Sequence, residues 1–154
     1  MISIEHLHPI VIHFPIVFFL TLAALDIVAS LRGHSITGRS AVGNASAGLA
    51  VLSAVTAIAA FLLGDEALEI AEAGGFSSEI AEIHETLGMV VAALFSVWAV
   101  VRAYLWLKDK DVQGGLKWLI LVIETGGAAL VVTTAYFGGI LVYELGVNVM
   151  RTVQ

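Results

Sequence analysis

The chain contains no cysteine among its 154 residues. That absence excludes disulfide bonds, thiolate metal ligands, iron–sulfur ligation by this chain and the covalent attachment of a c-type haem. Charge is also scarce, because only 13% of the residues are charged, whereas ordinary soluble domains have about 25%. The net charge of −6 argues against a nucleic-acid partner, since such a partner requires a basic surface.

Apolar residues make up 59% of the chain and give it a mean hydropathy of +0.97. A helix needs about 20 apolar residues to cross a bilayer, and four runs are long enough. They cover residues 9–31, 42–63, 86–107 and 116–141, with an acidic loop expected over residues 64–83. Within that segment, Ser77-Ser78 before Glu79 is a candidate N-terminus for the third helix, and EALEIAEA suggests either a short interfacial helix or a solvated loop. The sequence therefore predicts an all-α integral membrane protein, a single domain over residues 1–154 folded as an up-down-up-down four-helix bundle. No internal repeat stands out.

The basic residues lie almost entirely beside two of the connections. Lysine and arginine are enriched in cytoplasmic loops, so this asymmetry predicts a multi-pass protein of a bacterial or archaeal cytoplasmic membrane with both termini outside. The lipid bilayer is then its first partner. Arg32, Arg39, Arg102, Lys108, Lys110 and Lys117 flank the connections between spans one and two and between spans three and four, and only Arg151 lies at the other end.

Three of the five histidines and both prolines fall within one stretch, HLHPIVIHFP. Pro9 suits a first helical turn, whereas Pro15 removes the donor for the Val11 carbonyl and predicts a bend. His13 lies about 7–8 Å deeper than His8 along a helix. An imidazole in lipid is costly unless it is paired or ligating, so we expect His13 to face His84, at matching depth on span three.

Two equal spacings place a charged side chain on the same face of a helix as each of two histidines. Asp26 follows His8 by eighteen residues, and Arg102 follows His84 by eighteen, which is five turns of about 3.6 residues. The spacing predicts an Asp26–Arg102 ion pair at the opposite end of the bundle. Glu124, the remaining intramembrane charge, is expected to join this pair or to serve as a proton site.

Three interpretations of the histidines stay open on residue chemistry alone. Facing imidazoles in a helix bundle can hold a b-type haem, with His8, His13 and His84 as candidate ligands and Gly88, Gly138 and Gly139 leaving room for the macrocycle. The same histidines, with Glu85, suit a zinc or copper ion. In the third interpretation they form hydrogen bonds within a structural subunit that binds no cofactor.

Four segments together resemble a known family. They are HPIVIHFPI, AALDIVAS, HETLG and AYFGGILVYELGVNV, and they look like the bacterial membrane domain of unknown function 2231 over essentially the whole chain. Some relatives are joined to Rieske iron–sulfur or cytochrome modules, so the resemblance implies a place in membrane electron transfer. Some relatives have aspartate at the position of His13 and some have histidine at that of Ile140, so the resemblance favours His8 and His84 as the ligand pair. The recurrent elements are His8-Pro9, Pro15, Asp26, His84, Gly138-Gly139 and Tyr143.

The leading expectation is a small b-type cytochrome that passes electrons between a quinol or membrane reductase and a separate acceptor. Such a chain is an electron-transfer or binding protein rather than an enzyme with its own substrate chemistry. The alternatives are a protein that binds or transports a divalent metal ion, and a structural subunit. The sequence leaves open a quinone, a separate redox protein and a second copy of the chain as partners.

Overall fold

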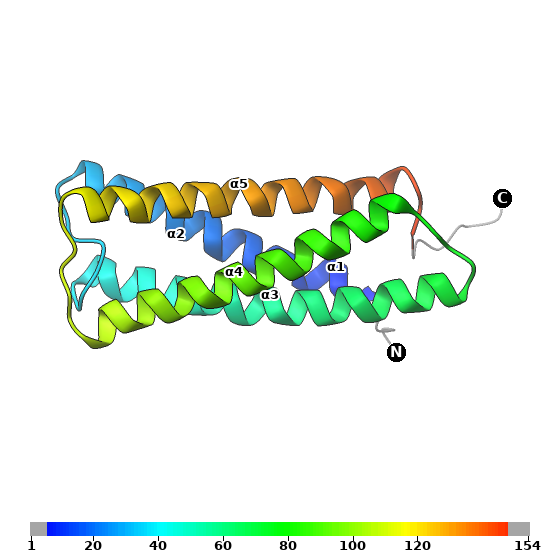
Figure 1. The fold of residues 1–154 in the computed structure, drawn as a ribbon, viewed down its shortest axis with the longest axis horizontal. Coiled ribbons are helices and arrows are strands. Elements are labelled where there is room, and N and C mark those ends of the chain that lie inside the picture. Colours follow the sequence, from blue (N-terminus) through cyan, green and yellow to red (C-terminus); the bar gives the residue numbers. More distant parts are fainter. Residues whose placement is uncertain (1–5, 148–154) are drawn as a thin grey trace.

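The computed structural model describes residues 6–147, which form a bundle of helices (Figure 1). Four segments are long and apolar enough to cross a membrane: His8–Leu31, Ala41–Ala73, Glu79–Leu107 and Gly115–Tyr143. The last three are the single helices α3, α4 and α5, and the first comprises α1 and α2. The predicted all-α, four-span bundle is therefore confirmed. Arg151, one of the residues used to predict the orientation, lies outside the described residues.

The first span is interrupted near its start. Helix α1 covers His8–Val11 and helix α2 covers His13–Leu31, with Ile12 between them. Pro15 has no N–H to donate to the carbonyl of Val11, so the helical hydrogen-bond pattern fails at this point. The break lies where the sequence predicts a bend.

The predicted acidic loop over residues 64–83 is wrong in extent, whereas the helix start suggested at Ser78 and Glu79 is confirmed. Helix α3 continues without interruption to Ala73, and α4 already begins at Glu79, so the connection contains only residues 74–78. After Gly64, the extension is rich in alanine, glutamate and leucine, which are strong helix formers, and no further glycine or proline occurs before Gly74-Gly75. The hydroxyl of Ser78 accepts a hydrogen bond from the Ile80 N–H at 3.2 Å and caps α4.

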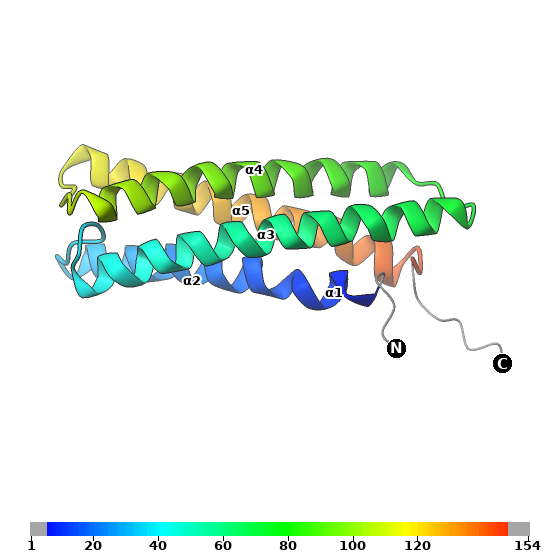
Figure 2. The same cartoon turned by 90° about the horizontal axis from the view of Figure 1, so that it is seen from below.

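The two ends of the bundle differ (Figures 1 and 2). The terminal end, as we call it, contains α1, the connection 74–78 and the end of α5. The loop end contains connections 32–40 and 108–114, which are bonded to each other. The Ser35 hydroxyl donates to Asp111 Oδ1 at 2.5 Å and the Gln113 amide donates to the same oxygen at 2.8 Å. These two bonds hold the pKa of Asp111 below its ordinary value.

Three pairs of residues meet between the first span and α4 along the axis of the bundle. His8 and His84 meet at the terminal end, and Asp26 and Arg102 form an ion pair towards the loop end. Between these two layers the rings of Phe19 and Phe95 stack, with centroids 3.8 Å apart and planes 8° apart. Both rings are buried in the apolar core.

The paired layers reveal an internal correspondence that the sequence did not make evident. In each of the three pairs, the α4 residue lies 76 positions after the first-span residue in the sequence. Likewise, several buried residues of α5 lie 74 positions after a buried residue of α3. The two hairpins, the first span with α3 and α4 with α5, therefore present equivalent positions to the core. The buried pairs at these offsets are Pro15/Val91, Phe19/Phe95, Leu22/Trp98, Ala23/Ala99, Asp26/Arg102, Ser46/Ile120, Ala47/Leu121, Ala50/Glu124 and Ala57/Val131.

Candidate functional site

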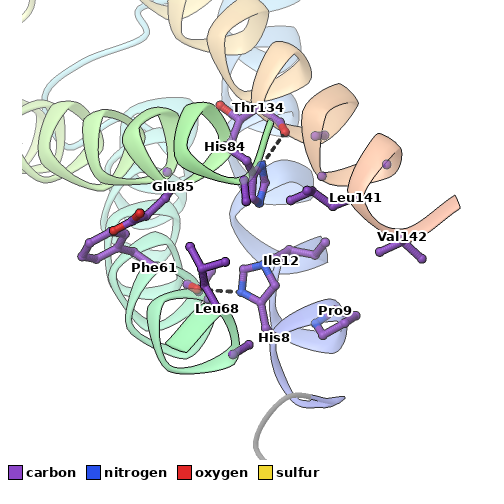
Figure 3. A pocket seen from close by; sticks show the side chains of 18 of the residues that line it. His8, Pro9, Ile12, Phe61, Leu68, His84, Glu85, Thr134, Leu141 and Val142 are labelled. Atoms are coloured by element: carbon purple, nitrogen blue, oxygen red, sulfur yellow. Dashed lines mark hydrogen bonds between the residues drawn. The ribbon is translucent and has the colours of Figure 1, made fainter. Parts of the chain in front are cut away.

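His8 and His84 face each other at the terminal end of the bundle (Figure 3). Their ring centroids are 6.1 Å apart and their planes are nearly perpendicular, at 83°. His8 is the first residue of α1, and His84 lies in the second turn of α4, which begins at Glu79. The short connection 74–78 and the early start of α4 thus bring the two imidazoles to the same depth.

Each imidazole is oriented by a backbone carbonyl of a neighbouring helix. His8 Nδ1 is 2.8 Å from the carbonyl oxygen of Ala60 on α3, and His84 Nδ1 is 3.0 Å from that of Thr134 on α5. A carbonyl only accepts, so each Nδ1 carries the hydrogen and donates it. Nε2 is then the unprotonated nitrogen of each neutral ring, and within residues 6–147 neither Nε2 has a hydrogen-bond partner.

A glycine lies under each ring, four residues after the accepting carbonyl. A Cβ at Gly64 would come within 2.7 Å of His8 Cε1, and a Cβ at Gly138 within 2.9 Å of His84 Cε1. Residues four apart lie on one face of a helix, one above the other, so a side chain there would cover the carbonyl that the histidine uses. We call each pair of carbonyl and glycine a histidine seat: Ala60 with Gly64, and Thr134 with Gly138.

The two imidazoles line a cavity of about 410 Å³ with mainly apolar walls. This volume lies within the range of about 300–1,000 Å³ that is typical of cofactor and ligand pockets. Gly88 and Gly139 both line the cavity; a Cβ at Gly139 would meet nothing within 4 Å, and one at Gly88 only the Phe61 ring at 3.8 Å. These glycines leave space, whereas Gly138 supports His84.

The structure places His8, and not His13, beside His84. His13 is exposed at the edge of the cavity, and its Nδ1 makes only a long contact of 3.4 Å with the carbonyl of Ile10. His8 belongs to α1 and His13 to α2, on either side of the break at Ile12, and only the His8 side chain reaches the carbonyl of Ala60 beside His84. The expected pairing of His13 with His84 therefore does not occur.

The site contains few other metal-binding side chains. Glu85 and Asp65 line the cavity, and His34 lies exposed in connection 32–40 at the loop end. No group of three or more histidine or acidic residues arranged for a metal ion occurs within the part of the chain that the structure describes.

The predicted charged residues come together at the opposite end of the span. Arg102 Nη1 lies 2.9 Å from Asp26 Oδ2 and 3.3 Å from Glu124 Oε1, and all three residues are buried. We call them the charged triad. Each comes from a different helix, so the triad ties α2, α4 and α5 together.

Several partners of these groups were not found from the sequence. The Ser46 hydroxyl donates to Asp26, the Trp98 indole donates to Glu124 Oε1 at 3.2 Å, and Arg102 Nη2 donates to the Ile36 carbonyl at 2.6 Å. Gly64 was also missed. Its 74-residue offset from Gly138, close to the offset between His8 and His84, is the one signal that could have identified it.

Comparisons with known proteins give a single result. No curated protein and no solved structure matches the chain. One family model, described as a predicted membrane protein (DUF2231), matches residues 5–151. The match covers nearly the whole chain, including both histidine seats and the charged triad. The chain belongs to the DUF2231 family of membrane proteins.

Proposed function

We propose that this protein binds a b-type haem between His8 and His84 and transfers electrons in the membrane. The observation that carries the proposal is the pair of facing imidazoles, each with Nδ1 bonded to a backbone carbonyl and Nε2 without a protein partner. Metal-ligating histidines almost always donate their second ring N–H to such an acceptor, which fixes the tautomer and the orientation of the ring. Both rings are thus prepared as ligands.

The separation of the rings also suits one iron between them. An imidazole nitrogen binds a metal at about 2 Å and the ring centre lies about 1 Å behind it, so two axial rings have centroids about 6 Å apart. The observed value is 6.1 Å. The adjoining cavity, with open space beside Gly88 and Gly139, is where the macrocycle would lie.

Haem fits this site better than a zinc or copper ion. A protein site for a bare ion usually needs three or four side-chain ligands, whereas haem brings four nitrogens of its own and needs only the two axial histidines. Within residues 6–147 the cavity offers no third ligand arranged with the pair. A subunit without a cofactor would give the two facing imidazoles and the cavity beside them no role.

The middle of the bundle favours electron transfer over ion transport. The stacked Phe19 and Phe95 rings separate the histidine site from the charged triad. The hydroxyl of Ser53, buried in α3, is bonded to the Leu49 carbonyl of its own helix. An ion would have to cross this apolar layer without ligands, whereas a haem at the terminal end can exchange electrons with a membrane quinone or a separate redox protein.

The test is the colour and spectrum of the purified protein. Protein produced with sufficient haem should be red, and its reduced-minus-oxidised spectrum should show the sharp α-band of low-spin, bis-histidine haem. A preparation that stays colourless after haem titration contradicts the proposal. If metal analysis of that preparation finds stoichiometric zinc or copper, the bare-ion alternative takes its place.

Histidine variants assign the ligands. His84→Ala and His8→Ala should each abolish the low-spin spectrum, because each removes an axial ligand. His13→Ala should keep that spectrum and lower haem affinity by at most about 10–100-fold, as expected of a residue outside the ligand pair. His34→Ala, at the loop end, is the control and should bind haem normally. If His13→Ala loses the spectrum while His8→Ala keeps it, the ligand assignment is wrong.

A further inference from the structure

The charged triad contains two acids and one base in the apolar interior of the bundle. The exposed fractions are 0% for Asp26, 2% for Arg102 and 1% for Glu124. If both carboxyl groups were ionised, the triad would carry one uncompensated negative charge inside a membrane protein. Such a charge is so costly that a buried acid is neutralised by a proton instead.

Asp26 has the shorter contact with the base of the triad. Its Oδ1 accepts the hydroxyl of Ser46 from α3, and its Oδ2 lies 2.9 Å from the guanidinium of Arg102. This Oδ2 contact is an ion pair without a hydrogen bond from the described residues. Charge-assisted contacts of this kind stabilise the ionised form.

Glu124 lies farther from the guanidinium than Asp26 does. Its Oε1 receives the Trp98 indole at 3.2 Å and Arg102 Nη1 at 3.3 Å, both longer than the Arg102–Asp26 contact. Its Oε2 is buried and, within residues 6–147, has no hydrogen-bond partner. An oxygen of this kind can carry a hydrogen at no loss of an existing contact.

We infer that Glu124 holds a proton and that the charged triad is a buried proton-binding site, electrically neutral as a whole. Asp26 and Arg102 form the ion pair, and Glu124 adds a neutral carboxylic acid. The groups that face the site are Asp26 from α2, Ser46 from α3, Trp98 and Arg102 from α4, and the Ile36 carbonyl from connection 32–40.

The surroundings give this site one side from which to exchange its proton. Towards the terminal end, the stacked Phe19 and Phe95 rings close it off. Towards the loop end, it is covered by Ile36, Thr37 and Val112, and the Thr37 hydroxyl accepts the Val112 N–H at 2.9 Å. These residues belong to connections 32–40 and 108–114, so local opening of the two connections would admit water to the triad.

Infrared spectroscopy of the protein in lipid nanodiscs tests the inference without haem. A protonated carboxyl group has a carbonyl stretching band that carboxylates lack, and this band moves to lower frequency when the proton is replaced by deuterium. At neutral pH the wild-type protein should show one such band, which should shift in deuterated buffer. Glu124→Gln, which has the shape of the protonated acid, should lose the band and keep the fold.

Two controls make the assignment specific. Glu72→Gln changes an exposed glutamate of α3 and should leave the band unchanged. In the wild-type protein, carbon-13 labelling of glutamate should move the band and carbon-13 labelling of aspartate should not. The inference is overturned if no band appears, if the band does not shift in deuterated buffer, if it survives in Glu124→Gln, or if it follows the aspartate label.

Discussion

Gly64 and Gly138 have no room for a side chain beneath the imidazoles of His8 and His84. We predict that Gly64→Ala and Gly138→Ala each weaken haem binding by about 10–100-fold, the range seen when residues that orient metal ligands are changed. The added Cβ would come within 2.7 Å of the ring of His8 and 2.9 Å of that of His84, so the ring must leave its carbonyl. Haem titration followed by absorbance measures the effect.

Each seat variant has a matched control on the same helix. A Cβ at Gly48 on α3 or at Gly126 on α5 would meet nothing within 4 Å. Gly48→Ala and Gly126→Ala should therefore bind haem as the wild-type protein does. Normal haem affinity in both seat variants would show that the seats do not orient the ligands.

For single residues, the correct predictions are those that follow from helical periodicity. His8 with Asp26 and His84 with Arg102 are each eighteen residues apart, and the structure places both pairs towards the axis of the bundle. The choice of His8 over His13 could not be predicted, because it depends on the direction of a short helix before the break at Ile12. Ser46, Trp98 and Gly64 depend on how closely helices approach, which no local pattern reports.

At the scale of helices, Gly127 of α5 packs directly against Phe19 of α2. A Cβ at Gly127 would lie 2.6 Å from Cε1 and Cζ of Phe19. We predict that Gly127→Ala destabilises the bundle by about 1–3 kcal/mol, the usual cost of overpacking a core, because α5 must move or the stacked phenylalanines must separate. Thermal unfolding in detergent, followed by circular dichroism, measures the change.

A substitution at the neighbouring Gly126 distinguishes the effect of packing on stability from that of helix propensity. Gly126→Ala adds the same methyl group on an open face of the same helix, so it should leave stability unchanged or raise it by up to about 1 kcal/mol. Equal effects of the two substitutions would mean that the contact with Phe19 is unimportant for stability.

The helices themselves were largely predictable, whereas one connection was not. Each of the four spans is an apolar run with a clear boundary, and the observed loop-end boundaries at Leu31, Ala41, Leu107 and Gly115 agree with the prediction within one residue. The error at residues 64–83 has a simple cause. Hydropathy marks where a chain leaves the membrane, but the helix continues past that point because its residues are good helix formers.

At the scale of the whole molecule, the orientation in the membrane is the next property to test. The basic residues gather at the loop end, so we predict that this end faces the cytoplasm. The natural chain has no cysteine, so single cysteines can be labelled without background. In intact cells, a membrane-impermeant maleimide should label Glu72→Cys at the terminal end and should not label Gln113→Cys at the loop end. The reverse pattern would place the histidine site on the cytoplasmic side.

The correspondence between the two hairpins also bears on how such a fold can be assembled. Two copies of the first hairpin would place Asp26 against Asp26 at the axis, and two copies of the second would place Arg102 against Arg102. The combination of one with the other instead places an acid against a base at this layer, where Asp26 and Arg102 form their ion pair. The connection 74–78 therefore joins two hairpins that present complementary groups to each other at the axis of the bundle.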